Sequence, residues 1–354
     1  MFRERVFYWG DPTYPYRIYT PRPGSHNNFD NANNTVDAFD VEPGYGGKLT
    51  GIKPLTNDIL VIYKENAIRR LSGSAPFASG GEQFTISAVT DEVGCVAPRT
   101  IVQVGAEHYF LGRNGMRQLK PIQAYGDIEH LQPTYPIQDK INSLNWATYS
   151  AITNACAVYV QSDNHIYLCV PNGSSTSNNK VYVYDTVTKG ITPRSSINAS
   201  YIAEYNRTLY HGDYAGQIYS HGASNGADGA SITAYAETKW MGHGGIGSYK
   251  RYKKLIIYAE GDGATDLTIL YKILKRGQVA STSTTQAIVA GDDAWDSGLW
   301  DTAVWSAGTQ NVFELKNLGR GKALKLRFQS TSATQRPKIR QVFLEYDVWG
   351  TMRG

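Results

Sequence analysis

The side chains in this sequence that could carry chemistry are scattered, without the spacing of a catalytic or metal site. Seven histidines, none in a His-x-x-x-His pair, lie at positions 26, 108, 130, 165, 211, 221 and 243. A lone histidine in a strand is more often a satisfied structural residue than a metal ligand. The three cysteines, Cys95, Cys156 and Cys169, are an odd number without metal-type spacing. We therefore expect no metal and no other cofactor.

Paired carboxylates are the groups that a sugar-cleaving enzyme would need. The candidates are Asp91 with Glu92 and Asp127 with Glu129, although turns also favour acidic residues. Residues 242–247 resemble a phosphate-binding glycine loop, but they precede basic residues and a strand, not the helix that such a loop uses. The leading expectation is therefore a protein that is not an enzyme.

Four hairpin-like stretches dominate the first two thirds of the chain. Each reads as strand, turn and strand, and they cover residues 59–71, 108–119, 166–185 and 209–219. A repeat every 45 to 55 residues or so is typical of propeller blades. We predict a β-propeller-like domain of about four to five blades, in which residues 6–8 either close the propeller by joining the last blade or belong to a fifth.

A glycine-rich stretch, residues 222–229, ends this repeat. Beyond it, longer strands alternate apolar and polar residues, at 232–240, 254–259, 266–273, 323–329 and 341–346. Such alternation is typical of a half-buried antiparallel sandwich. We therefore predict an all-β chain, with the propeller-like domain over residues 1–228 and an antiparallel β-sandwich over residues 229–354.

Charge divides unevenly between these parts. Residues 1–229 hold 18 Lys+Arg against 20 Asp+Glu and residues 230–354 hold 17 against 11, so net charges of −2 and +6 sum to the total of +4. Basic residues interleaved with strand residues usually form a solvated sheet face or an interface with an acidic neighbour, and a nucleic-acid patch is the sharper alternative. The basic interface candidates are Lys250, Arg251, Lys253, Lys254, Arg336, Lys338 and Arg340.

Two further segments are candidates for contacts with other chains. Trp295, Trp300 and Trp305 stand at five-residue steps, which is neither helical nor strand spacing. We expect their rings to pack from a loop onto the sandwich or a neighbouring chain. Residues 21–47 form a long polar connection, and a loop of that length is normally a functional or docking element. No apolar run approaches the roughly 18 residues that a membrane span needs.

Three runs of sequence give the chain a family resemblance. Residues 49–73 read LTGIKPLTNDILVIYKENAIRRLSG, residues 94–115 read GCVAPRTIVQVGAEHYFLGRNG, and residues 336–347 read RPKIRQVFLEYD, followed by Gly350 and Arg353. Together they resemble the tail nozzle, or tail tube component, of short-tailed bacteriophages, which belongs with the virion-stabilising proteins. The resemblance covers most of the chain and includes no catalytic signature.

That resemblance implies a structural virion protein of the phage tail, assembled in the host cytoplasm. It would form a ring, a homohexamer, below the portal and the adaptor, or head-tail connector, and tail fibres or spikes are further partners. Double-stranded DNA would pass through the ring when the genome is ejected. The stretch 21–47 would then dock onto the adaptor or the next subunit.

A conduit through which DNA slides should avoid many Lys and Arg contacts, because each neutralised phosphate adds salt-dependent affinity. We therefore expect the basic stretches to face neighbouring subunits or the outer surface, around a neutral to acidic bore. The main alternative is a carbohydrate-binding or carbohydrate-cleaving propeller used in host receptor recognition. A bacterial propeller module for protein interaction is the third hypothesis.

Overall fold

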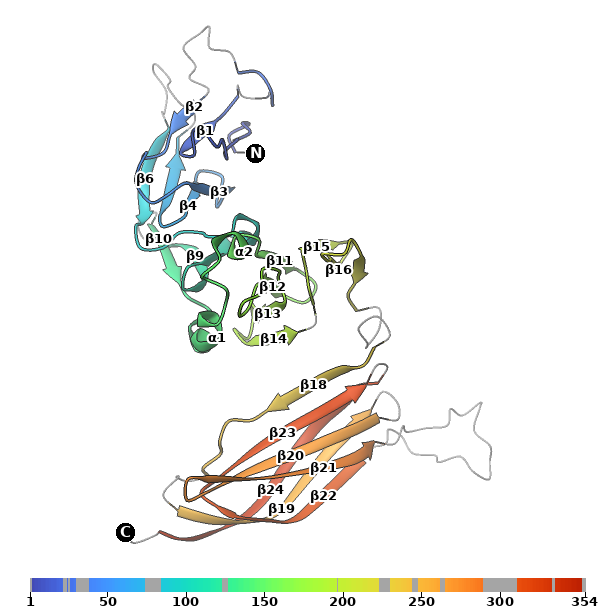
Figure 1. Cartoon of the computed structure of the whole chain (residues 1–354). Helices are drawn as coiled ribbons and strands as arrows, with labels where there is room; N and C mark the ends of the chain where they lie inside the picture. The colour runs from blue at the N-terminus through green and yellow to red at the C-terminus, as the bar shows by residue number, and fades with distance from the viewer. Residues whose placement is uncertain are drawn as a thin grey trace. The chain divides into compact units, whose positions relative to one another are not determined.

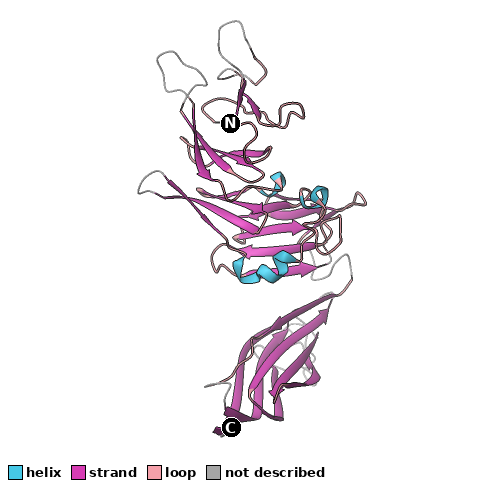
Figure 2. Ribbon diagram, turned by 60° about the vertical axis from the view of Figure 1, so that its left-hand side comes forward, coloured by secondary structure: helices cyan, strands magenta, loops and turns pink. Residues whose placement is uncertain are grey.

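The computed structural model describes residues 2–21, 24, 26–29, 38–73, 84–122, 127–195, 197–222, 230–243, 248–261, 265–288, 311–332 and 335–351. The chain divides into two compact units, Met1–His221 and Gly222–Gly354. The boundary predicted between residues 228 and 229 falls outside the described residues. Antiparallel strands build both units (Figures 1 and 2), so the all-β prediction is confirmed.

The N-terminal unit is a series of sheets made from strands that are consecutive in the chain (Figure 1). A two-stranded sheet comes first, followed by three sheets of four strands and one of three. Their strands are β1 (Arg17–Tyr19) and β2 (Ala38–Asp40); β3 (Leu49–Pro54), β4 (Leu60–Lys64), β5 (Ile68–Ser72) and β6 (Thr85–Thr90); β7 (Val102–Val104), β8 (Glu107–Gly112), β9 (Gly115–Ile122) and β10 (Asp127–Leu131); β11 (Cys156–Val160), β12 (His165–Val170), β13 (Lys180–Asp185) and β14 (Ile191–Ser195); and β15 (Tyr201–Tyr205), β16 (Thr208–Gly212) and β17 (Ile218–Ser220).

Four antiparallel strands in chain order are the construction of a propeller blade. The predicted hairpins are the pairs β4–β5, β8–β9, β12–β13 and β16–β17, so the propeller-like prediction is confirmed. Short helices interrupt the sheets: η2 (Pro98–Thr100), η3 (Tyr135–Ile137), α1 (Gln138–Asn142) and α2 (Tyr149–Ile152). Among the described residues, no helix has the length and hydrophobicity to cross a membrane.

The N-terminal residues do not complete the last blade. Tyr8 exchanges backbone hydrogen bonds of 2.8 and 2.9 Å with Tyr19 on β1. Of residues 6–8, Tyr8 therefore pairs with a further, N-terminal sheet and not with the last blade. In the described part of the chain, the last sheet of the N-terminal unit consists of β15–β17 alone.

Interior strands of this unit bury both of their faces. On β4, Leu60 and Ile62 belong to the core shared with β1–β2, whereas Val61 and Tyr63 belong to the core shared with β7–β10. Strand β12 alternates in the same way between the cores on its two sides. Successive side chains on a strand point to opposite faces. An unbroken apolar run is therefore what a strand between two sheets requires.

A buried polar link joins the first two four-stranded sheets. Tyr63 on β4 lies 2.8 Å from His108 Nδ1 on β8, and His108 Nε2 lies 2.9 Å from the carbonyl oxygen of Pro54. Because a carbonyl only accepts, Nε2 carries the proton and Nδ1 accepts from the tyrosine hydroxyl. The neutral ring thus satisfies both contacts, and burial lowers the pKa of His108 to about 4.

Acidification should weaken this unit before carboxylates titrate. A histidine in the unfolded chain has a pKa of about 6.5. Below that pH the unfolded chain binds a proton at His108 that the folded chain does not bind. The stability is therefore complete above about pH 6.5 and is lost as the pH falls toward the folded value. From pH 7 to pH 5 we expect the unfolding free energy to fall by about 1–2 kcal/mol because of His108. Urea denaturation at the two pH values measures this fall. His108→Gln should reduce the pH dependence by this amount, while His211 and His221, whose pKa values are also lowered, maintain the remainder. An unchanged pH dependence would contradict the assignment.

Gly94 permits a close backbone approach between the same two sheets. A Cβ at this position would lie 2.3 Å from the carbonyl carbon of Glu65 and 2.4 Å from the nitrogen of Asn66. The next residue, Cys95, donates its N–H to the carbonyl of Lys64 at 2.9 Å. Any side chain at Gly94 would push this segment off the β4–β5 turn.

Gly94→Ala should therefore lower the unfolding free energy by about 2–4 kcal/mol. Gly190→Ala is the matched control, because a Cβ there meets only the hydroxyl of Thr188, at 3.3 Å, and it should be nearly neutral. Urea denaturation of both variants measures the difference. Equal effects would show that backbone contact at Gly94 is not the constraint.

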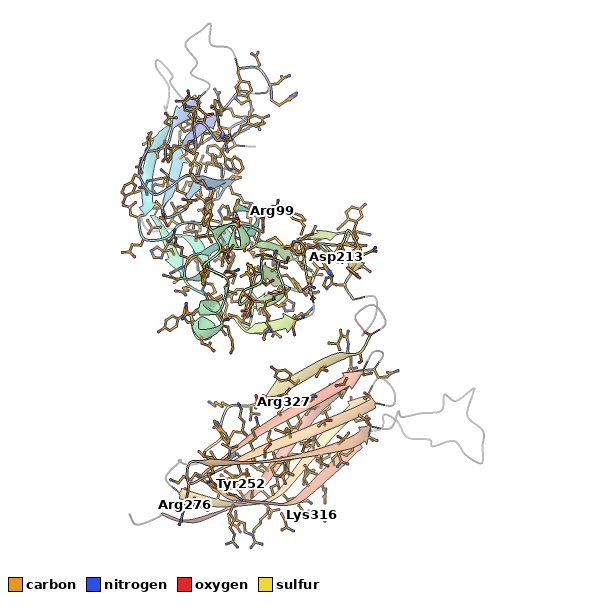
Figure 3. All side chains as sticks on the ribbon, viewed as in Figure 1. Arg99, Asp213, Tyr252, Arg276, Lys316 and Arg327 are labelled. Carbon is orange, nitrogen blue, oxygen red and sulfur yellow. The ribbon has the colours of Figure 1, made fainter. Side chains whose placement is uncertain are left out.

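The C-terminal unit consists of two antiparallel sheets around one core, which confirms the predicted sandwich. Its core includes Tyr252 (labelled in Figure 3), Leu255 and Ile257 from one sheet, and Ile269 and Leu326 from the other. The first sheet is β22 (Asn311–Gly321), β19 (Ser248–Gly261) and β24 (Pro337–Thr351); the second is β18 (Ile232–Glu237), β23 (Ala323–Ser332), β20 (Thr265–Lys275) and β21 (Gln278–Ile288).

Candidate interaction surfaces

One pair of histidines comes together that the sequence spacing did not reveal. His211 Nδ1 lies 2.8 Å from His221 Nε2, and the ring of His211 stacks on Tyr219 with centroids 5.0 Å apart. Burial lowers the pKa of both histidines, that of His221 to about 4. Within the described ranges, no group of three or more His, Cys, Asp or Glu side chains could hold a metal ion. The hairpin turn between β16 and β17 is the only sequence signal that points to this pair.

The carboxylate candidate Asp91 contributes to structure. It contacts Arg69 Nη1 at 2.7 Å, and Glu42 contacts Arg69 Nε at 2.7 Å. Arg69 is 2% exposed, so these two carboxylates compensate a buried charge. The side chains of Asp127 and Glu129 lie outside those described. Arg69 on β5 thus holds both Asp91 and Glu42 against the first four-stranded sheet.

The prediction that residues 21–47 form one docking loop is wrong for its second part. Residues 38–40 form β2, and Asp40 receives two hydrogen bonds from Arg17, of 2.7 and 3.0 Å. Val41 is fully buried in the first core. Pairing with β1 and this burial fix the segment, so deleting residues 21–47 would remove part of the fold. Residues 22, 23, 25 and 30–37 lie outside the described ones.

Lys250 cannot serve as an interface residue through its side chain. It is fully buried, and its ammonium group donates to the carbonyl of Lys322 at 3.2 Å. On β19 the alternation of faces points Lys250 inward together with Tyr252, so this member of the basic run does not reach the surface. Arg251, Arg336, Lys338 and Arg340 are exposed, and Lys253 and Lys254 are partly exposed. Trp295, Trp300 and Trp305 lie outside the described residues.

Carboxylates of the same sheet neutralise several of these basic side chains. Lys253 Nζ lies 2.8 Å from Asp347, and Arg340 lies 2.8 Å from Glu260. Glu314 forms ion pairs with Lys254 and with Lys316, the latter labelled in Figure 3. These exposed pairs add little stability. They do reduce the positive potential that β19 and β24 would otherwise present.

The two end sheets of the N-terminal unit carry exposed aromatic faces. On β15–β17, Tyr201, Tyr205 and Ile218 are 55%, 76% and 77% exposed. At the other end, Tyr8 and Tyr14 beside β1 are 41% and 48% exposed. Tyrosine is enriched at protein interfaces because it combines a large contact area with a hydrogen-bonding group. The sequence contains 25 tyrosines, and only the fold shows which of them lie on these faces.

No protein-family model and no curated protein matches the sequence. Solved structures match only distantly. PorZ, a surface component of the type-IX secretion system of Porphyromonas gingivalis, is 14% identical over 61% of this chain and 23% of its own, with a TM-score of 0.30. Core factor of S. cerevisiae is 8% identical over 93% and 54%, with a TM-score of 0.36. A study of carbohydrate-binding modules of the β-sandwich superfamily contributes a third structure, 6% identical over 98% of both chains at a TM-score of 0.20.

This chain spans less than two thirds of the length of the first two structures. TM-scores this low carry no argument about fold or function. The strand topology and the surfaces described above therefore carry the functional argument.

Removing the neutralising carboxylates should create affinity for DNA. The variant Glu260→Gln, Glu314→Gln, Asp347→Asn would free the cations paired with them, and we expect at least about tenfold tighter binding to double-stranded DNA at low salt, with a steeper salt dependence. Filter binding across a salt series measures both quantities.

The control carries three acid-to-amide changes in the N-terminal unit, Glu4→Gln, Glu92→Gln and Asp163→Asn, all at exposed positions outside the ion pairs described above. It changes net charge equally and should bind DNA weakly, as we expect of the native chain. A native chain that binds as tightly as the first variant would refute the neutralising role of these carboxylates.

Proposed function

We propose that this chain is a structural protein of the tail of a short-tailed bacteriophage, the tail nozzle, whose copies form the wall of a ring-shaped conduit for DNA. The resemblance of residues 49–73, 94–115 and 336–353 to that family supports the proposal. In this proposal the chain catalyses no reaction and works by shape, as one segment of a wall below the head-tail connector.

The observation that carries the proposal is the uncovered outer face of the last sheet. Interior sheets bury both faces, yet Tyr205 and Ile218 on β15 and β17 are 76% and 77% exposed. A propeller that functions alone covers its blades by closing. A series of sheets that ends on an aromatic face is suited to a larger assembly, in which a neighbour covers that face.

The charge pairing on the sandwich supports the same function. A channel for DNA must not hold it through many phosphate contacts. Lys253 and Arg340 are matched by carboxylates on neighbouring strands, each at 2.8 Å. The basic surplus of the C-terminal unit is therefore compatible with a surface along which DNA slides.

Imaging of the purified full-length chain tests this function. We expect negative-stain micrographs to show rings with a central pore, and six-fold averages would agree with the hexamer that the family resemblance implies. Single particles of monomer size that bind glycans, or that release reducing ends from host polysaccharide, would overturn the proposal in favour of receptor recognition.

A further inference from the structure

We propose that the outward face of β15–β17 binds the outward face of the β1–β2 sheet in a second copy of this chain, so that subunits join head to tail. This inference rests on the proposed function, because it specifies the subunit contact of the ring. The two faces lie on sheets at opposite ends of the N-terminal series in chain order (Figure 1).

The sheets of the N-terminal unit pack against one another in the order in which they occur in the chain. Each four-stranded sheet uses one face for the sheet before it and the opposite face for the sheet after it. The β1–β2 sheet uses one face, through Ile18, and β15–β17 uses one face, through Ile202 and Leu209. Adding a second copy in the same direction therefore continues an interface that the chain already makes four times.

Strand register defines the docking face of the last sheet. Tyr205 pairs with Thr208, and Ala203 pairs with Tyr210, so these side chains share the face opposite Ile202 and Leu209. Ile218 joins this face because it pairs with Gly212, which in turn pairs with Tyr201. We call the set formed by Tyr201, Ala203, Tyr205, Thr208, Tyr210 and Ile218 the tail face.

Register also defines the face of the first sheet. Arg17 pairs with Asp40, and Tyr19 pairs with Ala38, whereas Ile18 and Phe39 point to the core. The Arg17 guanidinium lies over the ring of Tyr14, 4.1 Å from its centroid. We call the set formed by Tyr8, Asp11, Tyr14, Arg17, Tyr19 and Asp40 the head face.

Charge favours head-to-tail contact over contact between two tail faces. The tail face is flanked by the exposed cations Arg99, whose guanidinium lies 6.0 Å from the Tyr201 ring, and Arg207. On the head face Arg17 and Asp40 neutralise each other, and Asp11 adds a carboxylate whose pKa is lowered by a hydrogen bond from Tyr19. Contact between two tail faces would bring cations against cations, whereas contact with a head face brings them against a carboxylate.

A contact between two different faces is heterologous. Repeated around an axis, heterologous contacts close into a ring, and if the rotation does not close they produce a filament. The same contact on every copy would thus generate the conduit from one type of interface. It would also bury the exposed tyrosines on the first and last sheets of each N-terminal unit.

Cross-linking between copies tests the proposed contact. One sample of the full-length chain carries the substitution Tyr14→Cys, and a second sample carries Tyr205→Cys. A bis-maleimide cross-linker spans the roughly 10 Å between packed sheets. The three native cysteines are buried and should not react in the folded chain. Both substituted tyrosines are exposed, at 48% and 76%, and unchanged circular dichroism and melting temperature confirm that the variants fold.

We expect a covalent dimer when the two variants are mixed and at most a trace with either alone. The double variant should give a ladder of multimers. Dimers from Tyr205→Cys alone would show that two tail faces meet, and an internal cross-link in a monomeric double variant would show that one chain closes on itself. Either result overturns the inference, as does tail-face binding to oligosaccharides that Tyr205→Ala abolishes.

Failure of this inference and failure of the proposed function give different results. Rings in micrographs without a cross-link between residues 14 and 205 would leave the nozzle proposal in place and reject the contact. Cross-linked open filaments without a central pore would support the contact and reject the conduit. The substitution Tyr205→Glu should reduce association at least tenfold, whereas Val187→Glu, at an equally exposed position of 70% outside both faces, should not.

Discussion

The N-terminal unit depends on one constraint: an interior strand must bury side chains on both of its faces. On β4, the side chains of Val61 and Tyr63 point into one core, whereas those of Leu60 and Ile62 point into another. This arrangement joins neighbouring sheets without long-range connections, because consecutive hairpins supply consecutive sheets. It also leaves an uncovered face at each end, and that consequence leads from the fold to the function proposed here.

Much of the fold follows from the sequence because period and turn chemistry are local. The stretches 59–71 and 166–185 are predicted as hairpins, and the pairs β4–β5 and β12–β13 occupy them. By contrast, β21 and β22 were not expected: Gln278–Ile288 is rich in Ser and Thr, and its polar composition resembles a loop when its neighbours in the sheet are unknown.

The interaction surfaces were less predictable, since they depend on which face a strand presents. Lys250 and Arg251 are adjacent in the sequence, yet one is buried and the other exposed. The partners of Lys253 and Arg340 come from other strands of the sheet, which a list of basic stretches does not contain. Likewise, in the sequence Asp91 is only a carboxylate near a turn, and the fold shows that it compensates the buried charge of Arg69.

The central claim is that the end sheets of this chain are completed by other copies of itself. Native mass spectrometry of the full-length protein tests that claim most directly, because each chain adds 39.1 kDa. The account predicts one closed assembly of defined copy number. A protein that remains at 39.1 kDa at all concentrations would contradict it.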